Sequence, residues 1–318
     1  MTFKYKRALV TGGAGFIGSH LVEALVSEGS EVVVIDDLST GRFENLKDVQ
    51  DEITFYHGDI RDRDLLLRAA ENCEVIFHQA AVVSVPQTVE HPAESAAVNE
   101  MGTIFVFEAA RNSGAKRVIF ASSCAIYGDD PELPKDENMK PKPQSPYAAQ
   151  KLAGEIHAGL YRELYDLEVV CLRYFNVYGP RQDPSSPYSG VISIFMRRAL
   201  DGTRPVIYGD GNQYRDFIFV KDVIAANFLA ANTDGIDESI FNVATGDYIR
   251  INRLWEMIRQ LACVTLEAEY QDCRPGDIIE SVADIDRARK SLRFEPRFTF
   301  EEGLKETMEW YRGMKNRD

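Results

Sequence analysis

The chain has 318 residues, of which 45% are hydrophobic, and its formal net charge at pH 7 is −14. The length suggests two domains or one large domain with an elaborated end, and the hydrophobic content suffices for a full core. The acidic balance argues against nucleic acid and anionic membranes as general partners. The sequence shows no signal peptide and no apolar run long enough to span a bilayer, so we expect a cytoplasmic protein.

Short apolar runs alternate with helical patterns over the first half of the chain. We expect strands at residues 8–10, 31–35, 53–57, 74–78, 117–121 and 168–172. We expect helices that start near Phe16 and that cover about 62–70, 92–113 and 146–165. Six strands that alternate with helices predict an α/β fold with a Rossmann-type, doubly wound parallel sheet.

The sequence changes character after Asn176. A proline-rich loop at residues 179–187 is followed by helical segments near 191–200 and 254–261 and by a closing amphipathic helix at 301–312. We expect a smaller mixed α/β substrate domain here, at the carboxyl edge of the sheet, where open α/β folds bind ligands. The predicted Rossmann domain comprises residues 1–178 plus about 216–245, and the substrate domain comprises about 179–215 and 246–318.

Three glycines at spacings of three follow the first strand. Gly12 would permit a tight turn, Gly15 would let the backbone approach a pyrophosphate, and Gly18 would let the helix pack closely on the strand. This strand, glycine turn and helix together indicate a dinucleotide-binding motif, although a glycine turn in an ordinary α/β protein is the alternative. Asp36 ends the second strand, where a carboxylate binds ribose hydroxyls and repels a 2′-phosphate, so NAD is favoured over NADP.

Tyr147 and Lys151 are four residues apart and therefore share a face of their predicted helix. A phenolate base at neutral pH needs its pKa lowered by about three units, about 4 kcal/mol. The Lys151 cation and a positively charged nicotinamide have the sign that such a shift requires. Ser123, at the end of the fifth strand, could share in the proton transfer. The alternatives are a solvated helix pair and serines that only cap a turn.

The cysteines and histidines do not predict a metal site. The sequence contains no Cys-x-x-Cys pair, and the cysteines have no metal-ligand spacing with the five histidines. We expect scattered cytosolic thiols at Cys73, Cys124, Cys171, Cys263 and Cys273.

The motifs along essentially the whole chain resemble the extended short-chain dehydrogenase/reductase family and, within it, the UDP-hexose 4-epimerases. The resemblance rests on the glycine loop, Asp36, Gly58-Asp59-Ile60, His78-Gln-Ala-Ala81, Asn99, Ser122-Ser123, Tyr147-x-x-x-Lys151, Arg173-Tyr-Phe-Asn-Val177, Arg215-Asp-Phe-Ile-Phe-Val220 and Arg274-Pro-Gly-Asp277. Sister families depart from it. At the end of the fifth strand the 4,6-dehydratases have a motif similar to Thr-Asp-Glu-Val-Tyr-Gly, whereas this chain has Ser123-Cys124-Ala125-Ile126-Tyr127-Gly128. The UDP-glucuronate decarboxylases have Glu in place of Ala125. Without those carboxylates, dehydration and decarboxylation are disfavoured.

The resemblance implies 4-epimerisation of UDP-sugars through a 4-keto intermediate, with tightly bound NAD that is regenerated in each cycle. It implies three catalytic residues: Ser123, Tyr147 and Lys151. It implies NAD contacts from Gly12, Gly15, Phe16, Ile17, Gly18, Asp36, Asp59, Ile60, Ala80, Asn99, Ser122, Tyr147, Lys151 and Tyr174. It implies substrate contacts from Ser84, Ser123, Tyr147, Asn176, Val191, Tyr208, Arg215, Arg274, Asp277 and Ser281, although loop arginines are often only solvated surface groups.

The resemblance also bears on the sugar. In these epimerases a residue shortly after the Arg-Pro-Gly-Asp stretch lies beside the sugar C2 substituent, and here Ser281, a small residue, takes that place. Together with Ser84 and the Arg181–Pro187 loop, Ser281 favours UDP-GlcNAc and UDP-GalNAc, with UDP-Glc and UDP-Gal as further substrates. A UDP-uronate 4-epimerase, another nucleotide-sugar oxidoreductase and a non-catalytic NAD-binding sensor or scaffold remain alternatives. The helices at 92–113 and 146–165 resemble those that pair subunits in this family, so we expect a homodimer.

Overall fold

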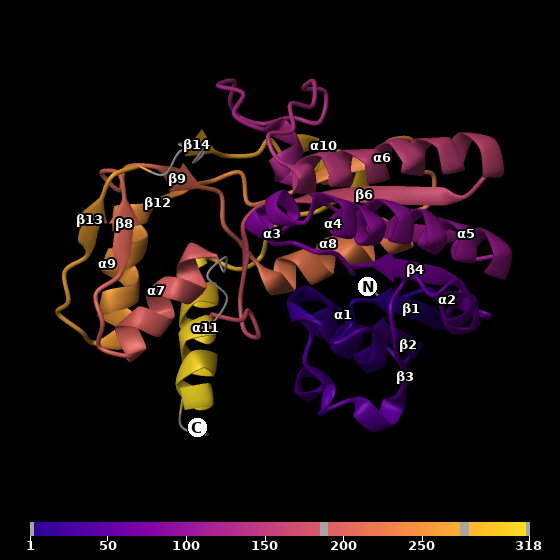
Figure 1. Ribbon diagram of the computed structural model, residues 1–318, viewed down its shortest axis with the longest axis horizontal. Coiled ribbons are helices and arrows are strands. Elements are labelled where there is room, and N and C mark those ends of the chain that lie inside the picture. The colour runs from indigo at the N-terminus through magenta and orange to yellow at the C-terminus, as the bar shows by residue number, and fades with distance from the viewer. Residues whose placement is uncertain (1–2, 185–189, 274–279, 316–318) are drawn as a thin grey trace.

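The computed structural model describes residues 3–184, 190–273 and 280–315 (Figure 1). Its central sheet has seven parallel strands in the order β11-β6-β5-β4-β1-β2-β3. These are β1 (Arg7–Thr11), β2 (Glu31–Asp36), β3 (Ile53–His57), β4 (Val75–His78), β5 (Arg117–Ser123), β6 (Glu168–Tyr174) and β11 (Ile240–Val243). The chain winds outward from β1 in both directions, which confirms the predicted doubly wound sheet.

Both faces of this sheet are buried, which explains why its strands are almost continuously apolar. Along β1, Ala8 and Val10 pack on one face and Leu9 on the other, because successive side chains of a strand alternate. One face is covered by α1 (Phe16–Ser27), α8 (Val220–Asn232) and α10 (Asp286–Leu292). The opposite face is covered by α2 (Arg63–Ala70), α5 (Thr103–Ser113) and α6 (Pro146–Tyr165).

The six predicted strands are present, and their ends differ from the predicted ends by at most two residues. β5 continues to Ser123 and β6 to Tyr174, so both predicted serines lie on the sheet itself. The predicted helix at 92–113 is not regular: α4 (Pro92–Ala96) passes through a π-helical turn (Ala97–Gly102) into α5. β11 and α8 had not been predicted, because β11 has only four residues and α8 follows an apolar run without a turn signal.

A second, smaller set of elements packs beside the sheet (Figure 1). Its core lies among α7 (Val191–Leu200), α9 (Ile251–Ala262) and α11 (Phe300–Lys315), where Phe195, Trp255 and Leu304 are buried. Its short strands form a parallel pair of β8 (Val206–Tyr208) with β13 (Glu269–Gln271). They also form a mixed sheet in which β9 (Tyr214–Arg215) lies between β12 (Ile249–Arg250) and β14 (Glu280–Ser281). β7 (Val177–Tyr178) pairs with β10 (Ile218–Phe219), and α3 (Val85–Glu90) follows β4. The domain boundaries given above stay a prediction.

Candidate active site

The glycine loop between β1 and α1 has the geometry that its sequence predicts. Gly12 has a φ of +68°, and a Cβ at this position would lie 2.7 Å from the backbone nitrogen of Ala80. A Cβ on Gly18 would overlap the carbonyl oxygen of Gly12, so only glycine lets α1 approach the turn this closely. The N-cap residue of α1 is Gly15, and no side chain caps this N-terminus. This arrangement fits the diphosphate of NAD.

Asp36, at the carboxyl end of β2, is bound to the glycine loop. Its two carboxylate oxygens accept hydrogen bonds from the backbone nitrogens of Ala14 and Leu38, each at 2.9 Å. Burial of the carboxyl raises its pKa above the ordinary value. Asp36 therefore places a carboxylate at the edge of the loop, where the adenosine ribose of NAD would lie, and the predicted ribose contact fits this position.

Several of the other predicted NAD contacts have their polar groups engaged within the protein. Asn99, in the π-helical turn, accepts from the Val82 nitrogen at 2.8 Å and donates to the Val82 oxygen and to Gln150. Ser122 donates to Glu155 at 2.5 Å, and Asp59 is ion-paired with its neighbour Arg61, which lowers the pKa of Asp59.

Tyr174 hydrogen-bonds to Gln79 and Asn227, whereas Ile60 and Ala80 pack in the core beneath α5. Asn99 and Ser122 thus connect neighbouring segments of the site through hydrogen bonds within the protein. Their direct contacts with NAD stay a prediction.

The three predicted catalytic residues come together at the carboxyl ends of β5 and β6. Ser123 closes β5, and Tyr147 lies on the first turn of α6, where an interaction with Ser123 acts to lower the pKa of the phenol. Lys151 is 3% exposed, and its ammonium donates to the carbonyl of Ala121 at 2.8 Å and lies 5.8 Å from the centre of the Tyr147 ring. Because Lys151 is buried, the alternative that Tyr147 and Lys151 form a solvated pair on the helix surface is wrong. Ser123 does cap a turn by accepting from Ala125 nitrogen, and it also contacts Tyr147.

Burial determines the proton affinities of this cluster in the protein chain alone. It raises the pKa of Tyr147 to about 12, and only the interaction with Ser123 opposes that shift. Burial likewise lowers the pKa of Lys151 to about 8. The lowered Tyr147 pKa that the sequence predicts also requires the positive charge of a bound nicotinamide, so it stays a prediction.

Three of the predicted substrate contacts also lie together, next to β9. Arg215 on β9 is paired in register with Ser281 on β14. The side-chain nitrogen of Asn176 donates to the carbonyl of Asp216, the residue after Arg215, at 2.7 Å. A basic group, an amide and a small hydroxyl residue are thus held within one small region of the structure.

The remaining predicted substrate contacts are more scattered. Ser84 caps α3 by accepting from the Gln87 nitrogen, Val191 is the first residue of α7, and Tyr208 ends β8. Arg274 and Asp277 lie outside the described residues.

Two buried polar groups near the site had not been singled out from the sequence. Glu155 forms a two-point ion pair with Arg173 on β6, and both side chains are 3% exposed. Asp216 is fully buried and accepts four hydrogen bonds. The sequence did carry a signal for each: Glu155 follows Tyr147 and Lys151 at helical spacing, and Asp216 is a carboxylate next to the apolar run of β10.

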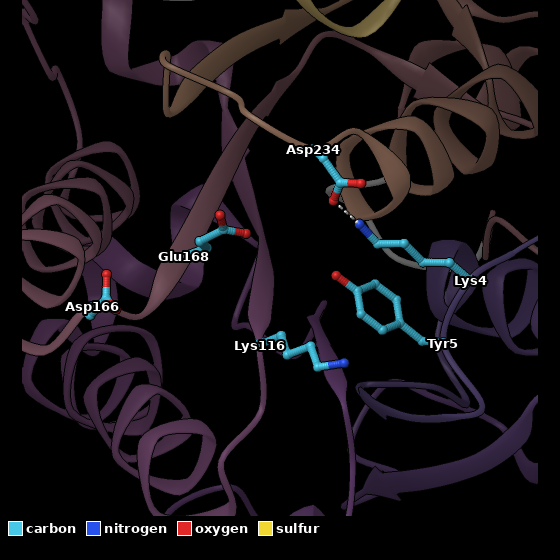
Figure 2. Close-up of a pocket in the computed structure, with 6 residues that line it drawn as sticks. All are labelled: Lys4, Tyr5, Lys116, Asp166, Glu168 and Asp234. Carbon is cyan, nitrogen blue, oxygen red and sulfur yellow. Dashed lines mark hydrogen bonds and ion pairs between the residues drawn. The ribbon is translucent and has the colours of Figure 1, made fainter.

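One cavity of about 540 Å³ lies away from this cluster, at the amino-terminal ends of the strands (Figure 2). It is lined by Lys4, Tyr5, Lys116, Asp166, Glu168 and Asp234. Lys4 is ion-paired with Asp234 across it, Lys116 with Glu74, and Glu168 with Arg117.

No helix in the described ranges has the length and apolarity that a bilayer crossing requires. The same ranges contain no group of three metal-ligating side chains.

Comparisons with known proteins agree with this geometry. Residues 8–244 match the family model described as the NAD dependent epimerase/dehydratase family. A UDP-glucose 4-epimerase of Mycolicibacterium smegmatis is 43% identical over 310 residues, which are 96% of this chain and 98% of that protein.

Two solved structures superpose closely. A UDP-N-acetylglucosamine 4-epimerase from Methanobrevibacter ruminantium M1, in complex with UDP-N-acetylmuramic acid, has a TM-score of 0.94 at 43% identity and covers 98% of this chain and 99% of its own. A UDP-glucose 4-epimerase from Thermotoga maritima, with UDP-glucose, has a TM-score of 0.93 at 39% identity, with coverage of 97% and 99%. The chain therefore belongs to the NAD-dependent epimerase/dehydratase family.

Proposed function

We propose that this protein is an isomerase that interconverts UDP-sugars differing in configuration at C4, through a 4-keto intermediate. The observation that carries the proposal is the cluster of Ser123, Tyr147 and Lys151 at the carboxyl ends of β5 and β6. The residues after Ser123 are Cys124 and Ala125, where dehydratases have carboxylates. The similarity to 4-epimerases over nearly the whole chain supports it.

The chain's own residues account for the proton transfer. The chemistry that NAD supplies when bound is the removal and return of a hydride at the sugar C4. In its ionised form, the phenolate oxygen of Tyr147 accepts the proton of the sugar 4-hydroxyl, directly or through the neighbouring Ser123 hydroxyl, and the neutral phenol later returns that proton. Lys151 places a positive charge next to the phenol, which favours its ionised form when the site holds its cofactor.

Epimerisation also requires that the nucleotide is held while the sugar turns over. Arg215 and Asn176 belong to the region around β9, and the planar guanidinium of an arginine can donate paired hydrogen bonds to the phosphate oxygens of a diphosphate. Residues 179–215 and 246–318 would form the part of the protein that binds the nucleotide. The sugar would then rotate about its link to the diphosphate in the space between this region and Tyr147.

We further propose that N-acetylated sugars are accepted. Ser281 is small, and it lies next to Arg215 on the adjacent strand, so a bulky C2 substituent would meet little obstruction at this position. The similarity to a UDP-N-acetylglucosamine 4-epimerase supports this assignment, while the similarity to UDP-glucose 4-epimerases supports plain hexoses as further substrates.

We also propose that the protein is a homodimer. The outer face of α6 exposes Ile156, Leu160 and Leu164 at a spacing of four residues, with exposed fractions of 58%, 43% and 62%. Met101, in the π-helical turn, is 47% exposed. An apolar row of this kind on a long helix is typical of a helix-to-helix interface between two subunits.

A single experiment tests the catalytic proposal. Purified protein without added NAD is mixed with UDP-GlcNAc, and the products are followed by proton NMR. We expect UDP-GalNAc to accumulate to an equilibrium ratio, which requires 4-epimerisation, retained cofactor and tolerance of the N-acetyl group. Turnover of UDP-Gal but not UDP-GlcNAc would remove only the N-acetyl assignment. Silence with both sugars after NAD is added would contradict the proposed function and favour a UDP-uronate or a non-catalytic role.

A further inference from the structure

We propose that Asp216 is a positioning residue that assembles the nucleotide side of the site, an inference that rests on the proposed UDP-sugar function. Its carboxylate joins three segments that are far apart in sequence: β9, the loop after β11 and the segment after β14. Arg215 lies on β9 and Ser281 on β14, and Asn176 binds the backbone carbonyl of Asp216. Asp216 itself is 0% exposed and so does not reach the substrate.

The contacts of Asp216 define this role. One carboxylate oxygen accepts from the backbone nitrogen and the hydroxyl of Thr245, at 2.9 and 2.7 Å. The other accepts from the backbone nitrogens of Gly246 and Ala283, at 3.0 and 3.3 Å. All four partners are donors, which a carboxylate satisfies and an amide of the same shape does not.

The backbone of Asp216 also forms hydrogen bonds with the segments that carry the predicted substrate contacts. Its nitrogen donates to the carbonyl of Ser281 at 2.8 Å, and its own carbonyl accepts from the side chain of Asn176 at 2.7 Å. The segment 281–284 is held in turn by Lys135, which donates its backbone nitrogen to Val282 and accepts from that of Asp284. The distance between Arg215 and Ser281 therefore depends on how well Asp216 is bound.

The groups around Asp216 are consistent with this role. Arg215, the last residue of β9, directly precedes it and supplies a positive charge. Burial raises the pKa of Asp216 to about 6, against the effect of its four hydrogen bonds. The structure thus keeps an acidic group in a costly environment and surrounds it with donors, which is typical of a side chain that connects segments.

The test is the substitution Asp216→Asn in the NAD-loaded enzyme. The amide keeps the volume of the carboxylate, but one of its orientations places its N–H groups against the backbone N–H and hydroxyl of Thr245. The other orientation places them against the backbone N–H groups of Gly246 and Ala283. We expect the dissociation constant for UDP, which is not turned over, to rise at least about tenfold, with retained NAD unchanged. We expect KM for the UDP-sugar to rise more than kcat falls.

A matched control separates positioning from general destabilisation. Asp222 on α8 is another buried carboxylate, 1% exposed, and it accepts from the backbone nitrogens of Arg297 and Phe298. Asp222→Asn therefore removes a similar group that holds no segment of the site, and UDP affinity should stay within about twofold of wild type. UDP binding by Asp216→Asn that equals wild type would overturn the proposal.

A second pair of variants keeps the proposal testable if Asp216→Asn does not fold. Thr245→Val removes one of the four donors, and Thr245→Ser restores the hydroxyl. We expect weaker UDP binding in the first and recovery in the second, whereas equal binding in both would contradict the role of Asp216. A wild-type enzyme that binds UDP but epimerises no UDP-sugar would contradict the proposed function alone, because these variants are judged by binding.

Discussion

Tyr147 is the residue whose chemistry the proposed reaction needs most. It interacts with Ser123, and the centre of its ring lies 5.8 Å from the Lys151 ammonium. We predict that Tyr147→Phe lowers kcat for a UDP-sugar by about a thousandfold, because general acid–base catalysis at a single group contributes about 10²–10⁴. Steady-state kinetics measures this effect. NAD content and UDP affinity should be preserved, since only one hydroxyl is lost, and a variant that retains a tenth of the activity would remove Tyr147 from its role.

Ser281 is the residue on which the proposed acceptance of N-acetylated sugars depends. Its side chain is 9% exposed on β14, and its strand partner is Arg215. A tyrosine at this position would fill the space that a C2 N-acetyl group needs, so Ser281→Tyr should lower kcat/KM for UDP-GlcNAc by about a hundredfold and that for UDP-Glc by less than about fivefold. Both sugars are assayed with one preparation. An equal loss for both classes would show that Ser281 does not face the sugar C2.

Between the elements, the buried ion pair of Glu155 and Arg173 determines how α6 sits on the sheet. Glu155 on α6 accepts from Arg173 on β6 at 2.7 and 2.9 Å and from Ser122 on β5 at 2.5 Å. Tyr147, Lys151 and Glu155 lie on the same face of α6, so this contact also fixes the catalytic side chains.

We predict that Glu155→Gln lowers the free energy of unfolding by about 3–5 kcal/mol, because it leaves the Arg173 guanidinium buried without a counter-charge. Chemical denaturation measures the difference. The matched control is Glu163→Gln, an exposed residue of the same helix, for which we expect a change within about 0.5 kcal/mol. If the two variants lost equal stability, the ion pair would not hold α6 in place.

The elements that could be predicted are those with a local pattern. Strands such as β3 and helices such as α6 were found with the predicted ends, because the periodicity of their apolar residues specifies them. The same holds for Tyr147 and Lys151, whose relation is a helical spacing. The partnership of Ser122 with Glu155 spans 33 residues and that of Asp216 with Ala283 spans 67, so no local pattern contains them. The raised pKa of Tyr147 follows from depth of burial, which only the packed structure determines.

For the molecule as a whole, the proposed homodimer depends on the apolar row of α6. Leu160→Glu places a charge in the middle of that row, and burying it against a second subunit would be unfavourable. We predict that sedimentation velocity finds wild-type protein at twice the chain mass and Leu160→Glu at the chain mass. Leu67→Glu on α2 is the control, because Leu67 is similarly exposed, at 40%, and lies outside this row. Dimers that persist in Leu160→Glu would place the interface elsewhere.

The response of global stability to acid depends on His78, which lies in the middle of the sheet. Its Nε2 donates to the Thr103 hydroxyl at 2.9 Å, since the proton of that hydroxyl goes to the Asn99 carbonyl, and its Nδ1 therefore accepts from Thr11 at 2.8 Å. The ring is neutral with both nitrogens satisfied, and burial lowers its pKa to about 3. The unfolded chain binds a proton at this histidine below about pH 6.5, whereas the folded protein does not, so acid destabilises the fold.

We predict that the stability lost through His78 between pH 7.5 and pH 5.0 is about 2 kcal/mol. His20, with a pKa lowered to about 4, adds to the loss, while Asp216, with a pKa raised to about 6, opposes it because the folded state then binds the proton more readily. The contribution of His78 is isolated by His78→Gln, which cannot titrate in this range. At a fixed protein concentration, equilibrium denaturation at both pH values should show the wild type losing about 2 kcal/mol more than the variant. Equal losses would mean that the folded protein protonates His78 as readily as the unfolded chain does.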